Sequence, residues 1–93
     1  PYADALLRCA FERLSQALQD AGAPPVHSYG LQCAATDLSA ALAASRWFND
    51  KSARVSVYEA LTVFAANGDP AATLKLAVAV DAAAAMLRLE RNL

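Results

Sequence analysis

The sequence has only three glycines, two cysteines and one histidine among its 93 residues, and each scarcity excludes a class of protein. Cys9 and Cys33 are too few for a disulfide framework, and they lack the C-x-x-C spacing of a metal site. Three glycines do not make a phosphate-binding loop. His27 by itself supplies neither a metal cluster nor a Ser-His-Asp set. We therefore expect a chain that is not an enzyme, with no catalytic residues, bound metal or cofactor.

The chain also lacks a marked excess of positive or negative charge. Eight basic and nine acidic residues are spread along the chain, so there is neither a basic footprint for nucleic acid nor an acidic tail. No signal peptide is visible, and the longest apolar run is broken by Lys75 and Asp81, which argues against a membrane span. We expect a cytoplasmic protein with two free thiols. The sequence opens with Pro1 rather than an initiator methionine, so we expect a processed or trimmed product.

Alanine is the residue that the sequence has in abundance, at 24 of the 93 positions. Such small side chains favour close contact between helices, with leucine as the main large apolar residue. A chain of this length forms one domain and buries only about 60–65% of the surface that its unfolded state exposes. We expect residues 1–93 to form a single all-α domain, either a small four-helix antiparallel bundle or a helical array.

Turn-forming residues divide the chain into four helical segments. Gly22 and the prolines at 24–25 end the first segment, and residues 67–68 end the third. Asp69 is expected to cap the last helix, with Pro70 in its first turn. The predicted helices are about 3–21, 31–48, 52–66 and 70–91, with a linker at 22–30.

The start of the third helix is less sharply marked. Asn49, Asp50 and Ser52 are all candidate N-caps. The short stretch 54–58, RVSVY, alternates in the manner of a strand, although a helix describes it better.

Placing residues at about 100° per position assigns one face of each helix to the core. In the first helix this face consists of Leu6, Leu7, Ala10, Phe11, Leu14, Ala17, Leu18 and Ala21. In the second helix it consists of Leu31, Ala34, Ala35, Leu38, Ala41, Leu42 and Phe48. In the third and fourth helices it consists of Val57, Ala60, Leu61, Phe64, Leu76, Val80, Ala83 and Leu87.

The second and fourth helices each have a further apolar stripe nearly opposite the core face. Such a stripe is covered either by another helix of the same chain or by another subunit. Trp47 is a candidate anchor because tryptophan is frequent among binding hot spots. Ala85 belongs to the stripe of the fourth helix. The candidate interface residues on and beside the two stripes are Trp47, Cys33, Ala40, Ala44, Val78, Ala82, Leu89, Asp81 and Arg88.

Asp81 lies on a thin polar strip of the fourth helix, with no basic residue three or four positions away. One interpretation places its carboxylate in solvent, since aspartate is seldom buried without a partner. The other pairs it with an arginine of a neighbouring helix or subunit, so that Asp81, Arg88 and Arg46 fix the register of an interface. His27 is expected to be an ordinary loop histidine, and Cys9 an ordinary thiol at the edge of the first helix.

The surplus apolar faces predict a non-enzymatic protein-interaction or oligomerisation module, whose partner is another protein or, more simply, a second copy in a homodimer. Two alternatives remain open. A weak helix-turn-helix pattern over 47–61 carries Lys51 and Arg54, but Asp50 and Glu59 oppose phosphate binding, which makes nucleic acid a poor candidate partner. A helical domain that binds a small apolar ligand is the third hypothesis.

Overall fold

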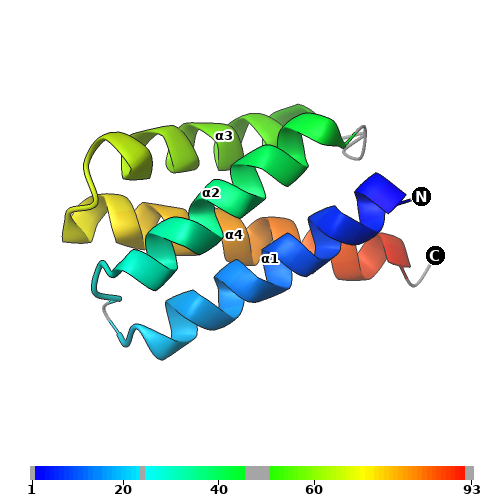
Figure 1. Ribbon diagram of the computed structural model, residues 1–93. Coiled ribbons are helices and arrows are strands. Elements are labelled where there is room, and N and C mark those ends of the chain that lie inside the picture. The colour runs from blue at the N-terminus through cyan, green and yellow to red at the C-terminus, as the bar shows by residue number, and fades with distance from the viewer. Residues whose placement is uncertain (1, 24, 46–50, 92–93) are drawn as a thin grey trace.

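The computed structural model contains four α-helices and, over the described residues, no strand (Figure 1). It describes residues 2–23, 25–45 and 51–91, and the side chains of 4–23, 25–45 and 52–86. The expected all-α class is confirmed, and the segment 54–58 is helical. The helices are α1 (Tyr2–Asp20), α2 (Tyr29–Ala44), α3 (Lys51–Ala66) and α4 (Pro70–Arg91).

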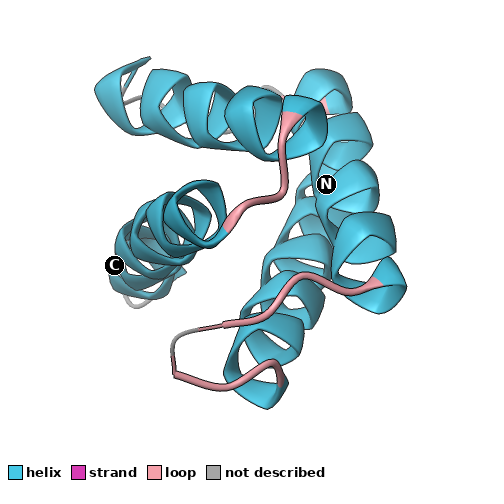
Figure 2. Cartoon of the chain, turned by 90° about the vertical axis from the view of Figure 1, so that its left-hand side faces the viewer, coloured by secondary structure: helices cyan, strands magenta, loops and turns pink. Residues whose placement is uncertain are grey.

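Consecutive helices run in opposite directions, so α1 begins and α4 ends at the same end of the molecule (Figure 1). α1 packs along α2 and α3 packs along α4, while α1 with α4 and, less extensively, α2 with α3 join the two pairs. Over the described parts of the chain, α2 does not approach α4 and α1 does not approach α3. Figure 2 looks onto the end where the α1–α2 and α3–α4 connections lie. The chain is therefore a small antiparallel bundle.

The connection between α1 and α2 is shorter than predicted. Gly22 has a φ of 104°, in the left-handed region that glycine adopts at little cost, and it follows the end of α1. Ser28 is the N-cap of α2, because its Oγ accepts a hydrogen bond from the Leu31 N–H at 3.1 Å. The predicted linker at 22–30 is therefore too long, since α2 starts at Tyr29.

α2 also ends earlier than the predicted residue 48. Ser45 is extended, with φ −92° and ψ 142°, and its N–H donates to the Ala41 carbonyl as a C-terminal cap. The predicted helix is therefore too long at this end, because α2 stops at Ala44. Trp47 and Phe48 themselves lie outside the described residues.

The start of α4 agrees with its sequence pattern. Asp69 Oδ1 accepts a hydrogen bond from the Ala72 N–H at 2.7 Å, and Pro70 is the first helical residue. Ser52, a candidate cap of the preceding helix, lies inside α3 instead. The other two candidates, Asn49 and Asp50, lie outside the described residues.

The core lies between the inner faces of all four helices. The side chain of Leu6 is 47% exposed, so its predicted place in the core is wrong; it lies roughly 100° around α1 from the centre of the buried arc. The described part of the chain contains neither the side chain of Leu87 nor that of Phe48. The buried core residues are Leu7, Ala10, Phe11, Leu14, Leu18, Leu31, Ala35, Leu38, Leu42, Val57, Ala60, Leu61, Phe64, Leu76, Val80 and Ala83.

A polar network joins three helices at the end of the bundle where α2 terminates. Arg54 of α3 donates from Nη1 to the Ser45 carbonyl at 3.0 Å and from Nη2 to the Leu42 carbonyl at 2.8 Å. The buried Ser45 hydroxyl donates to Asp4 Oδ1 of α1 at 3.0 Å. The cation therefore satisfies carbonyls that the end of α2 leaves unpaired, and it does so where the helix dipole is negative.

At the opposite end, His27 joins the two helix connections. Its ring lies 5.3 Å from that of Phe64 between centroids, and its Nε2 is 3.1 Å from Gln32 Oε1. A Cβ atom at Gly68 would collide with Cδ2 of His27 and lie 2.9 Å from its Nε2. Glycine is needed at 68 because the histidine occupies the space of a side chain.

Gly68→Ala is expected to lower the free energy of unfolding by about 1 kcal/mol, because His27 must leave Phe64 and Gln32 to make room. In a His27→Ala background, Gly68→Ala should lower the free energy of unfolding by only about 0.3 kcal/mol or less. Urea unfolding of the four variants measures the coupling. An equal cost of Gly68→Ala in both backgrounds would show that the histidine is not what excludes the side chain.

Candidate interaction surface

The outer side of α4 exposes a row of apolar side chains, opposite the buried Leu76 and Val80. Val78 is 64% exposed and Leu74 is 52% exposed, and no helix of the described chain covers them. The spacing of the row is that of one helix face. The α4 stripe, as we name this row, consists of Ala71, Leu74, Val78, Ala82 and Ala85.

Two charged residues border the α4 stripe. Lys75 and Asp81 are both exposed, three positions before and after Val78. The solvated interpretation of Asp81 is therefore the one that the isolated chain shows. The other interpretation, a pair with an arginine of a neighbouring subunit, requires an assembly. Leu74 and Lys75 were not among the residues predicted from the sequence, although Leu74 precedes Val78 by the four positions that keep residues on one helix face.

The outer side of α2 is the second predicted surface. Cys33, Ala40 and Ala44 are all exposed, so the chain does not cover this stripe with its own described helices. Thr36 and Asp37 interrupt it between Cys33 and Ala40. The α2 stripe is therefore less continuous in apolar character than the α4 stripe.

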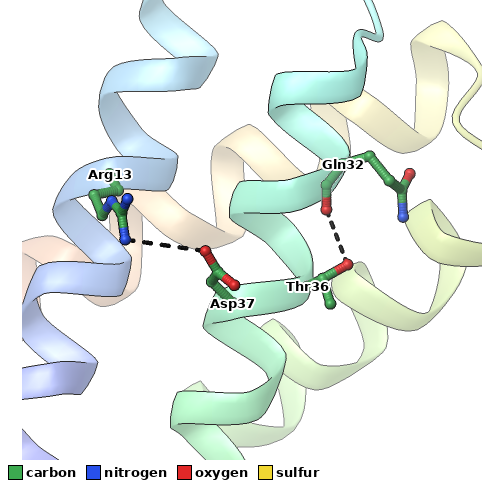
Figure 3. A network of polar contacts seen from close by, with 4 residues as sticks. All are labelled: Arg13, Gln32, Thr36 and Asp37. Atoms are coloured by element: carbon green, nitrogen blue, oxygen red, sulfur yellow. Dashed lines mark hydrogen bonds and ion pairs between the residues drawn. The ribbon is translucent and has the colours of Figure 1, made fainter.

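Polar contacts occupy that interruption (Figure 3). Arg13 of α1 points toward Asp37 of α2, with Nη1 and Oδ2 4.0 Å apart, and both side chains are mostly exposed. Thr36 Oγ1 donates to the Gln32 carbonyl at 3.0 Å. An exposed ion pair of this length contributes at most about 1 kcal/mol, so the contacts make the surface polar without stabilising it much.

Cys33 also interacts with Tyr29, one helical turn earlier. A hydrogen bond between the two side chains, and after it their charge interaction, raises the pKa of Tyr29 above its ordinary value of 10.0. The phenol is therefore protonated at neutral pH. Both cysteines of the chain, Cys9 and Cys33, are free and exposed.

The structure does not bring the two predicted stripes together. α2 and α4 occupy diagonal positions, so their outer sides face away from each other (Figures 1 and 2). The candidates Trp47 and Arg46 lie outside the described residues, and α4 contains Arg88 and Leu89 without their side chains being described. Of the nine predicted interface residues, Val78, Ala82 and Asp81 share the outer side of α4, and Cys33, Ala40 and Ala44 share the outer side of α2.

Residues considered for other functions make contacts within the fold. The guanidinium of Arg54 donates to the carbonyls of Leu42 in α2 and of Ser45 just after it. It also lies 5.5 Å from the ring centroid of Tyr58, so it is occupied within the fold. His27 packs on Phe64 at the other end of the bundle. The described side chains contain no group of three metal-ligating residues. Within the same residues, every helix is too short or too polar to span a bilayer.

Comparison of the chain with models of protein families, with curated proteins and with solved structures finds no match.

Proposed function

We propose that this chain is a non-enzymatic interaction module that associates with a second copy of itself through the α4 stripe. The association buries Leu74 and Val78 of both copies, which removes apolar surface from water at about 25 cal/mol per Å². A reducing, cytoplasmic setting belongs to the proposal, because both exposed thiols are free.

The observation that carries the proposal is the continuity of the α4 stripe. Single exposed apolar residues are common on any protein surface, whereas a contiguous row is typical of an interface. Leu74 and Val78 lie one turn apart on one helix face, and exposed alanines continue the row in both directions. Alanine also allows two helices to approach closely.

Val78→Glu is expected to weaken self-association about tenfold or more, because each copy would bury a carboxylate without a partner. The measurement is size-exclusion chromatography with light scattering, over a range of protein concentrations and with reductant present. The unchanged chain should give the mass of a dimer and the variant that of a monomer.

The matched control is Val26→Glu, which places the same charge at a 69% exposed valine of the connection between α1 and α2. It should leave the dimer intact. A monomeric mass for the unchanged chain at every concentration, or an intact dimer for Val78→Glu, would refute self-association through α4.

A further inference from the structure

The two edges of the α4 stripe differ in the sign of their charge. Lys75 and Asp81 fall roughly 60° to either side of Val78 when residues are placed around the helix. They are about 9 Å apart along the helix axis. Among the described side chains of α4, one edge of the stripe therefore carries the positive Lys75 and the other the negative Asp81, so these two charges are complementary to those of a second copy.

This pattern distinguishes the two ways in which two copies of α4 can pack. In a parallel pair, related by a two-fold axis along the helices, the positive edge of one stripe meets the negative edge of the other. In an antiparallel pair each edge meets its own copy, so lysine faces lysine and aspartate faces aspartate. The charges attract in the parallel pair and repel in the antiparallel pair.

The apolar spacing agrees with parallel packing. From Ala71 the steps are 3, 4 and 4 positions, and they repeat after eleven residues, so that the sequence continues the pattern to Leu89. An eleven-residue repeat is close to the natural period of a helix and keeps the stripe on one side. In a parallel pair in register, every position of this row faces the same position of the second copy. In an antiparallel pair centred on Val78, position 71 faces 85 and position 74 faces 82, so only positions 71–85 find an apolar partner.

We propose that the occupant of the α4 stripe is a second copy of this chain, with the two α4 helices parallel and in register. Lys75 of each copy then pairs with Asp81 of the second copy, twice in the dimer. This inference rests on the proposed function, because it specifies the geometry of the same self-association. The flexible stem of lysine spans the offset between the two charges along the helices.

Charge reversal tests the geometry. Lys75→Glu and Asp81→Lys should each weaken dimerisation about tenfold or more at low salt, since each turns two attractive pairs into two repulsive ones. The doubly substituted chain with both changes should recover the affinity. An equal mixture of the two single variants should form a heterodimer. Light scattering and sedimentation equilibrium measure the affinities, and circular dichroism confirms that these exposed substitutions leave the helices folded.

A second test is independent of charge. In a Cys9→Ser, Cys33→Ser background, Leu74→Cys should cross-link to its own counterpart with a short bismaleimide. Antiparallel packing places position 74 opposite position 82, so the cross-link would form only between Leu74→Cys and Ala82→Cys chains.

The outcomes separate the two proposals. If Val78→Glu disrupts the dimer while the single charge reversals leave its affinity unchanged, association through α4 stands and the parallel geometry is overturned. Cross-linking of Leu74→Cys only to Ala82→Cys overturns the parallel geometry in the same way. If the unchanged chain is a monomer, or Val78→Glu has no effect, the proposed function fails and this inference fails with it.

Discussion

Phe64→Ala is expected to lower the free energy of unfolding by about 3–5 kcal/mol, the range for removing a fully buried phenylalanine. Phe64 is 1% exposed, so the substitution loses the transfer free energy of its ring and leaves a cavity among packed side chains. It also removes the ring against which His27 packs. A domain of this size has a total stability of about 5–15 kcal/mol, so the loss is a large share of it.

Urea unfolding followed by circular dichroism measures this effect, and Val63→Ala is its control. Val63 precedes Phe64 on α3 but is 42% exposed, so its truncation should cost only about 0.5 kcal/mol. Similar losses for the two variants would contradict the burial assigned to the two faces of α3.

Arg54→Met is expected to lower the free energy of unfolding by about 2–3 kcal/mol. Methionine retains much of the apolar stem but none of the donors, so the carbonyls of Leu42 and Ser45 lose their charged partner. Hydrogen bonds to a charged group contribute about 1.5–3 kcal/mol, and here two of them share one cation that is partly exposed. Thermal and urea unfolding measure the loss.

Two further variants show whether the geometry of Arg54 matters. Arg54→Lys keeps the charge but not the fork that reaches two carbonyls, so it should recover less than half of the loss. Arg13→Met removes an arginine whose side chain is 75% exposed and 4.0 Å from Asp37, and it should cost at most about 1 kcal/mol. Equal losses of stability for Arg13→Met and Arg54→Met would show that the hydrogen bonds of Arg54 to the end of α2 contribute no more than an exposed ion pair.

The two large effects also bear on the proposed interface. The effects of Phe64→Ala and Arg54→Met on stability arise within one copy of the bundle. Phe64 lies in the core and Arg54 at the end of α2, so neither belongs to the α4 stripe. Variants of Val78 act between copies. If the chain dimerises, its unfolding midpoint rises with protein concentration, because the partner stabilises the folded state by mass action. Val78→Glu should abolish this dependence, whereas Arg54→Met should lower the midpoint and keep it.

The sequence was sufficient for the parts of the fold that depend on neighbouring residues. Gly22, Asp69 and Pro70 mark helix ends through local backbone preferences and hydrogen bonds, and the structure places them at those ends. The apolar period likewise identified both faces of α4, the buried Leu76 and the outward Val78. The early end of α2 was missed, since residues 45–48 contain neither glycine nor proline and so give no stop signal.

What the sequence by itself determined is the set of four helices and the presence of surplus apolar stripes on α2 and α4, because helix period and caps are local properties. Only the tertiary structure decided which stripes stay uncovered. The cyclic order of the helices puts α2 and α4 on a diagonal and leaves the outer side of each without a neighbour. The same arrangement brings Asp4 to Ser45 across 41 positions and Arg54 to the end of α2. Such contacts depend on how the helices pack around a shared core, which no short-range pattern encodes.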